Sequence, residues 1–284
     1  MSRDRLLAYG LLAPSVLFLA AIFFWPLGEA FLIAFRDPTG GGWTLVHFRT
    51  MVEDLNFQPA LTNTLLLVAV VVPLQLALAL ALAVLLTRLE RGRDVYLYIW
   101  TIPLGISDLA AGILWLAILS ERGYLNSLLH ALGLVEGPLL WLSYETPVAL
   151  FLSVVVAEVW RATAIVLVIL VAGMQLIPKE YYEAAEIFGA SAWQRFRKVT
   201  LPCLKASIQT ALILRTILAF EVFGVVIALG GRDLPVLAGE AFAWQYDYQD
   251  PGVAASYAVL ILAVSLLATW LYLRVLRVRE ETLL

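Results

Sequence analysis

The sequence predicts an all-α protein that crosses a membrane six times and carries a polar loop between its fourth and fifth spans. Of its 284 residues, 62% are hydrophobic and only 14% are charged, whereas soluble domains average about a quarter charged. Six apolar stretches are long enough to cross roughly 30 Å of hydrocarbon, which takes about 20 residues. Basic residues gather between alternate stretches. We therefore expect residues 1–284 to form a single transmembrane domain.

The six stretches follow one another with no low-complexity linker or obvious internal repeat. A signal peptide is an alternative for the first, because Arg3 and Arg5 precede it. However, this apolar run continues past Pro26, well beyond the roughly 7–15 apolar residues of a signal peptide. The expected spans are Leu6–Phe35, Ala60–Thr87, Val95–Leu119, Glu145–Gly173, Ser207–Leu229 and Gly252–Leu273.

The distribution of basic residues predicts the orientation of the chain. Thirteen lie at the two termini, between the second and third spans, and between the fourth and fifth, against four in the alternate links. The positive-inside rule then places both termini and the loop after the fourth span in the cytoplasm. It places the acidic, aromatic link Arg232–Pro251 outside. The thirteen residues are Arg3, Arg5, Arg88, Arg91, Arg93, Lys179, Arg195, Arg197, Lys198, Lys205, Arg274, Arg277 and Arg279.

The residues that usually carry catalysis or cofactors are scarce. The three lysines fit no phosphate-binding GxxxxGK[ST] pattern, so any ATP must be bound by a partner. His47 and His130 stand alone without metal-ligand spacing, and the single cysteine, Cys203, cannot form a disulfide within the chain. A net charge of -3 gives no sign of the basic surface that nucleic-acid-binding proteins carry. We expect a protein without catalytic residues, bound metal or bound cofactor.

The longest polar segment, EAAEIFGASAWQRFRKVTLP, begins at Glu183 and ends at Pro202. Pro178 suits the first turn of a helix, and the helix would end at Gly189, which permits a tight backbone turn. Ser191 can cap a second helix, Ala192–Val199, which Pro202 would stop. An ordinary solvated loop is the alternative.

This segment resembles the EAA loop of binding-protein-dependent ABC importer permeases. Asn63-Thr64 in the second span and Gly123, Asn126 and Leu129 after the third resemble further family patterns. Two departures are Phe188, where many relatives carry Asp, and Arg232, where they carry Pro. The residues of the segment that match are Glu183, Ala184, Ala185, Gly189, Ala190, Phe196, Leu201 and Pro202.

The resemblance implies the type I ABC importer permease fold, with a core region over residues 60–277 and a coupling loop over residues 176–205. In that family the loop docks on an ATPase subunit, and Glu183 would pair with a basic group there. The implied partners are a second homologous permease, an ATPase dimer that binds ATP and Mg²⁺, and an extracytoplasmic solute-binding protein. The chain would reside in a bacterial or archaeal plasma membrane, surrounded by lipid.

Five ionisable residues fall inside the expected spans: Asp108, Glu158, Arg161, Arg215 and Glu221. Each costs at least about 2.5–3.5 kcal/mol at the centre of a membrane helix, so they are expected to face the protein interior. Glu158 and Arg161 lie on one helix face and can pair. Two interpretations stay open: an ion-pair network that joins spans, and a polar cavity for a solute. Asp108 can instead cap a helix that restarts after Pro103 and Gly105.

A sugar offers hydroxyl groups for charged residues and apolar ring faces for aromatic ones. Trp160 and Phe220 lie beside the charged positions and could supply such faces. The resemblance is closest to the carbohydrate-uptake branch, whose sugar-contacting positions on the fourth and fifth spans correspond here to Glu158, Arg161, Ala162, Ile165, Arg215 and Ala219. We therefore expect import of a sugar, such as trehalose or maltose. The alternatives are a polyamine or amino-acid ABC permease and an ion-coupled secondary transporter.

Overall fold

The computed structural model describes residues 3–38, 40–87, 89 and 91–276. Three basic residues used for the orientation, Arg88, Arg277 and Arg279, lie outside them. The described part is helical, with one isolated β-bridge between Arg36 and Trp43. Four continuous helical segments are long and apolar enough to span a membrane, and two bent helix pairs bring the number to as many as six. The expected all-α membrane fold is confirmed.

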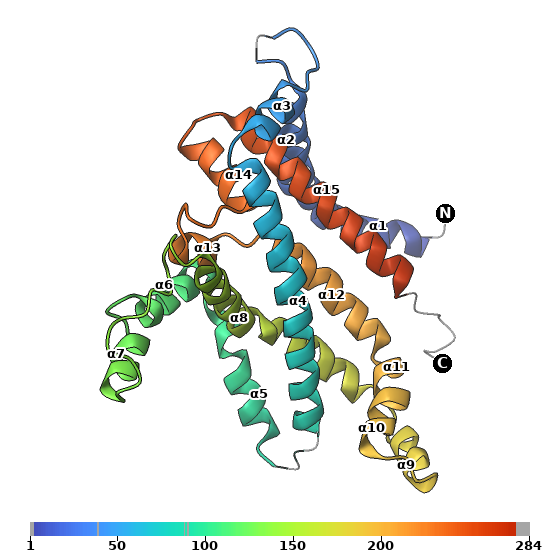
Figure 1. The fold of residues 1–284 in the computed structure, drawn as a ribbon. Helices are drawn as coiled ribbons and strands as arrows, with labels where there is room; N and C mark the ends of the chain where they lie inside the picture. The colour runs from blue at the N-terminus through green and yellow to red at the C-terminus, as the bar shows by residue number, and fades with distance from the viewer. Residues whose placement is uncertain (1–2, 39, 88, 90, 277–284) are drawn as a thin grey trace. The chain divides into compact units, whose positions relative to one another are not determined.

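The chain divides into two compact units. The first contains residues up to Gln58 together with Glu240–Leu260, and the second contains Pro59–Gly239 together with the residues from Ile261 onward. Figure 1 shows the helices in chain order. They are α1 (Arg3–Leu19), η1 (Ala20–Phe24), α2 (Trp25–Phe35), α3 (Val46–Glu53), α4 (Phe57–Thr87), α5 (Arg93–Thr101), η2 (Ile102–Gly105), α6 (Asp108–Leu119), α7 (Tyr124–Ala131), α8 (Pro147–Gln175), α9 (Lys179–Ile187), α10 (Ala192–Arg195), η3 (Phe196–Thr200), α11 (Leu201–Cys203), α12 (Lys205–Phe220), α13 (Gly224–Leu229), α14 (Leu237–Tyr246) and α15 (Pro251–Val275).

In the first unit, Asp54 at the end of α3 joins the chain segments that are distant in sequence. Its Oδ2 accepts hydrogen bonds from Trp244 Nε1 at 2.9 Å and from the Tyr257 hydroxyl at 3.4 Å. His47 is buried, and the space beside its ring admits only glycine at position 252, because a Cβ there would lie 2.2 Å from the ring. These contacts attach α3 to the start of α15.

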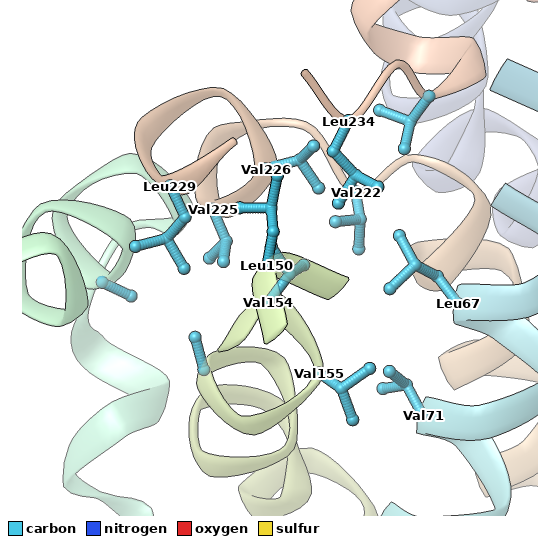
Figure 2. Close-up of a cluster of buried hydrophobic side chains, with 13 residues drawn as sticks. Leu67, Val71, Leu150, Val154, Val155, Val222, Val225, Val226, Leu229 and Leu234 are labelled. Atoms are coloured by element: carbon cyan, nitrogen blue, oxygen red, sulfur yellow. The ribbon is translucent and has the colours of Figure 1, made fainter. Parts of the chain in front are cut away.

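The second unit is built around α8, which is buried over much of its length. One apolar cluster joins Leu150 and Val154 of α8 to Val225 of α13 and Leu67 of α4, as Figure 2 shows. A second cluster joins the other half of α8 to Ala79 and Ala83 of α4. Small residues at such contacts let helix backbones approach closely, which is how membrane helices associate without a hydrophobic driving force.

The expected third span, Val95–Leu119, is not one straight helix. After α5 and the short 3₁₀ helix η2, the chain bends by 100° into the segment that begins with α6. Pro103 lies at the start of η2, and Ser107 caps α6 by accepting a hydrogen bond from the Ala110 amide. Because proline lacks an N–H and serine is a strong N-cap, local backbone chemistry overrides the continuous apolar composition.

The expected fifth span, Ser207–Leu229, is also divided. Helix α12 ends at Phe220 and α13 begins at Gly224. Gly112 of α6 and Gly224 permit very close packing of α6 on α13: a Cβ at Gly112 would lie 2.6 Å from the Ala228 Cβ, and one at Gly224 would lie 2.6 Å from the Leu109 amide nitrogen. A side chain at either position would force these helices apart.

Two of the patterns noted in the sequence hold a helix start and connecting segments in place. Asn63 donates a hydrogen bond to the Pro235 carbonyl at 2.9 Å, and the Thr64 hydroxyl accepts one from the Leu237 amide at 3.0 Å. Asn126, which is 4% exposed, uses both ends of its amide: it donates to the Leu139 carbonyl and accepts from the Leu139 amide and Trp141 Nε1. Both patterns therefore have a structural role.

Candidate functional site: a buried ion network and a polar helical loop

Glu158 on α8 is the centre of a buried network of charges. It is 1% exposed, as is its partner Arg215 on α12, and Arg215 Nη2 donates to Glu158 Oε2 at 2.7 Å. Arg161, one turn further along α8, donates through Nη2 to Glu158 Oε1 at 2.9 Å. The pair expected from the three-residue spacing is therefore present, and the carboxylate is shared between two guanidinium groups.

The network extends to α6 through Asp108. Its Oδ1 lies 3.3 Å from Arg161 Nε, and its Oδ2 accepts a hydrogen bond of 2.6 Å from the Gly224 amide at the start of α13. Asp108 thus caps the N-terminus of α13, while Ser107 caps the helix that begins at Asp108 itself. A carboxylate is favourable at a helix N-terminus because it meets unpaired N–H groups and the positive end of the dipole.

Gln75 on α4 completes the network, and the sequence reading missed it. Its Nε2 donates to the Glu158 carbonyl at 2.8 Å, and its Oε1 accepts from Arg215 Nε. Its side chain is fully buried. The signal was an amide within the long apolar run of α4, since a buried polar group must find a partner. Gln75 therefore brings a fourth helix, α4, into the network.

The four charges of the network cancel, because two carboxylates face two guanidinium groups. The space beside Glu158 and Arg215 is about 10 Å³, room for about one water molecule at most. The buried half of the network is therefore closed to a sugar in this chain. Its open edge consists of the half-buried side chain of Asp108 and the partly buried Arg161.

The remaining candidate cavity residues divide into buried and accessible positions. Ala162, Ala219 and Phe220 are buried, so in this conformation they pack the helices. Trp160 and Ile165 are partly buried, and the Trp160 ring stands edge-on to Trp115 with 6.0 Å between centroids. Glu221 does not join the network: it follows the last residue of α12, is exposed, and does not pair with Arg215. The break after α12 separates them.

The polar loop forms a helix-turn-helix between α8 and the start of α12, as Figure 1 shows. Helix α9 is followed by Gly189 with φ +71°, a left-handed conformation that favours glycine. Ser191 and Gln194 form a reciprocal capping box that starts α10. The second helix does not stop at Pro202: it continues through a π-helical turn to Cys203, and the chain bends by 67° before α12. Proline is tolerated there because it lies in the first turn of α11.

Two contacts join the two helices of this loop. Arg195 on α10 forms an ion pair with Glu186 on α9, and the Tyr182 hydroxyl lies 3.1 Å from Thr200 Oγ1. Its outer surface is unusually apolar: Ile187 is 84% exposed and Phe188 is 89% exposed. Glu183 is also exposed. Large exposed apolar side chains on a polar loop are typical of a protein–protein contact.

The described loop residues that match the EAA pattern have different surroundings. Glu183, Ala184 and Gly189 are exposed, whereas Ala185, Ala190, Phe196 and Leu201 are partly covered and Pro202 is exposed. Phe196 packs against Trp193 with 5.4 Å between ring centroids. The exposed residues are available to a partner.

Comparison with known families decides the identity of the chain. Residues 9–278 match the family described as binding-protein-dependent transport system inner membrane component. The chain belongs to this family. The permease is therefore an inner-membrane, non-catalytic subunit of an ABC transporter, as the resemblance of the polar loop indicated.

Individual relatives agree with this assignment. The permease is 35% identical over 202 residues to a trehalose/maltose transport system permease protein of Thermococcus litoralis, with 70% of this chain and 67% of the relative covered. It is 30% identical over 293 residues to a sulfoquinovosyl glycerol transport system permease protein of Agrobacterium fabrum, covering 98% and 92%. Its fold matches a chain of a bacterial ABC transporter for the acidic polysaccharide alginate, with a TM-score of 0.79, 24% identity and 96% of each chain covered.

Proposed function

We propose that the permease is one of two membrane subunits of an ABC importer that carries a neutral sugar, of the trehalose or maltose type, into the cytoplasm. A solute-binding protein would deliver the sugar on the outer side. A second homologous permease would complete the path through the membrane. Two ATPase subunits would bind ATP and Mg²⁺ and supply the energy. Both termini and the loop of residues 176–205 would face the cytoplasm.

The observation that carries the choice of a neutral cargo is the internal cancellation of charge in the ion network. An anionic sugar would need an accessible guanidinium group that no carboxylate compensates. Arg161 is shared between Glu158 and Asp108, and Arg215 pairs with Glu158. Arg215 Nη1 has no hydrogen-bond partner among the described residues, but the space beside it is only about 10 Å³, too small for a sugar. A polyamine would need carboxylates without compensating bases, and both carboxylates of the network are compensated. Relatives at similar identity carry names of neutral and of anionic cargo, so the residues of this chain must decide.

The sugar path itself would lie where the second permease covers the open edge of the network. Asp108 and Arg161 reach that edge, and both can hydrogen-bond hydroxyl groups. Glu221, exposed at the break between α12 and α13, and the partly buried Trp160 are the further candidates for contact. The buried pair of Glu158 and Arg215 would set the position of Arg161 without touching the sugar.

The assembled transporter in proteoliposomes tests the cargo. ATPase activity should rise when the binding protein is supplied with trehalose or maltose and stay basal with a sulfonated or phosphorylated sugar derivative or a polyamine. Stimulation by an anionic sugar alone would refute the neutral cargo while leaving an ABC importer. Uptake that persists without the ATPase subunits and follows an ion gradient would refute the importer itself.

The coupling role of the loop has its own test. Glu183→Lys should abolish ATP-driven uptake while the subunit still inserts, because it reverses an exposed charge on the face proposed to meet the ATPase. Glu136→Lys is the matched control, since Glu136 is exposed on a link proposed to lie on the outer side. Normal uptake with the Glu183 variant would show that this residue does not contribute to docking.

A further inference from the structure

A second pocket lies away from the ion network, between the ends of α4 and α8 and the loop helices. Its volume is about 740 Å³. Thr87 and Gln175, the last residues of two candidate membrane spans, line it together with Tyr182 of α9 and Phe196 of η3. The pocket is therefore placed where the membrane-spanning part of the unit meets the polar loop.

The charged residues of this pocket are all basic. Arg93 at the start of α5, Lys179 at the start of α9 and Arg195 at the end of α10 line it, and no carboxylate is among the described residues of its wall. Arg195 is already engaged by Glu186. Lys179 is exposed. Because Arg195 is paired with Glu186, Arg93 and Lys179 are the basic groups that give the pocket a positive potential and attract anions.

Arg93 has the strongest need for a ligand. Its Nη2 is removed from solvent and has no hydrogen-bond partner within the described part of the chain. A buried donor without an acceptor is unfavourable, and more so when the group is charged. Arg93 lines the pocket, so an anionic oxygen bound there could supply the missing acceptor. Guanidinium groups bind phosphate oxygens by strong, paired hydrogen bonds.

The rest of the wall indicates what carries the anion. Val84 on α4 with Met174 and Ile177 near the end of α8 give the pocket an apolar side that continues from the spans. A soluble inorganic anion would gain nothing from that side, whereas an amphipathic molecule would use both. Basic pockets between the cytoplasmic ends of membrane helices are suited to lipid headgroups.

We propose that this pocket binds the phosphate group of an anionic phospholipid from the cytoplasmic leaflet, with Arg93 and Lys179 as its ligands and the apolar wall beside its glycerol and upper acyl carbons. Because Lys179 belongs to α9, a bound lipid would also touch the coupling loop. This site is separate from the sugar path and does not depend on which sugar is carried.

Native mass spectrometry of the intact transporter complex tests the proposal. The complex is extracted from membranes and exposed to equal amounts of phosphatidylglycerol and phosphatidylcholine, and the retained lipids are counted. Arg93→Gln should lower the retention of phosphatidylglycerol about fivefold, the loss expected for one basic group beside an anionic lipid, and leave phosphatidylcholine unchanged. Arg91→Gln is the matched control, because Arg91 is exposed on the same link and does not line the pocket.

A second arm distinguishes the two sources of phosphate. The delipidated complex is equilibrated with radiolabelled inorganic phosphate, which should bind weakly and in the same way with and without the Arg93 substitution. Strong phosphate binding that disappears in Arg93→Gln, with no preference for the anionic lipid, would refute the lipid. Equal retention of phosphatidylglycerol in the Arg93 and Arg91 variants would refute the site. The same result is expected if the ATPase, rather than a lipid, occupies the pocket.

Discussion

Replacing Glu158 by glutamine should leave the guanidinium group of Arg215 buried without a carboxylate partner. The carboxylate now holds Arg215 at 2.7 Å and Arg161 at 2.9 Å. Arg161 keeps Asp108 as a partner when Glu158 loses its charge. Arg215, at 1% exposure, would then face only neutral amides, those of Gln75 and of the new glutamine, and the nearby space admits about one water molecule.

The expected cost follows from these surroundings. Breaking a buried ion pair by removing one partner costs about 3–5 kcal/mol, because the other charge remains buried and uncompensated. Folded domains are stable by about 5–15 kcal/mol in total, so this loss is a large share of the stability. Removing both charges should restore most of it, since replacing a whole buried pair by uncharged groups is often nearly neutral. The double variant Glu158→Gln with Arg215→Met is the matching rescue.

Thermal unfolding of the detergent-solubilised complex, followed by the loss of its monodisperse chromatographic peak, measures the effect. Glu158→Gln should lower the midpoint by many degrees, and the double variant should recover most of that shift. Glu221→Gln is the control, because it removes the same type of charge at an exposed position and should cost less than about 0.5 kcal/mol. Equal midpoints for the two single variants, or a double variant as unstable as Glu158→Gln, would refute the reasoning.

Two further predictions concern packing and orientation. Gly112→Ala would place a methyl group 2.6 Å from the Ala228 Cβ and should destabilise the unit by about 1–3 kcal/mol through overpacking; the same unfolding assay with Gly28→Ala, where nothing lies within 4 Å, is the control, and equal midpoints would contradict the close packing of α6 on α13. Cys203, the only cysteine and exposed, should react with a membrane-impermeant maleimide in inside-out vesicles but not in intact cells, and more slowly than a free thiol near neutral pH because burial raises the pKa of its thiol. Labelling from outside the cell would reverse the proposed orientation.

The sequence was sufficient where the signal is local. Composition and span length predicted the membrane fold, and the spacing of Glu158 and Arg161 predicted their pairing. Gly189 and Ser191 predicted the turn and the cap of the loop, because each acts on its own backbone. Hydropathy failed at the two bends. A hydropathy average sums side-chain character over a window of residues. Ser107 and the residues after Phe220 end or start a helix without making that window polar.

The site depended on contacts that no local pattern contains. Arg215 lies 57 residues from its carboxylate partner, and Gln75 lies 140 residues from Arg215. Which of the buried charges meet is decided by how α4, α8 and α12 pack, and one sequence does not give that packing. Glu221 is the converse case. Its position within an expected span placed it among the candidate cavity residues, but α12 ends just before it and leaves it exposed.

Leu204, the single residue between α11 and α12, is a point about which a movement of the loop could tilt α12 and so shift the ion network. Leu204 is fully buried, and beside it a Cβ at Gly173 would lie 2.1 Å from Ser207 Oγ, so α8 and the start of α12 are in tight contact at this point. Arg215 lies eleven residues further along, about 16 Å at 1.5 Å per residue. If α12 tilts by about 10° around Leu204, Arg215 would move by about 3 Å. This displacement is about the length of its hydrogen bond to Glu158. A small rotation transmitted from the loop to α12 would therefore be enough to break or form the ion pair between Glu158 and Arg215.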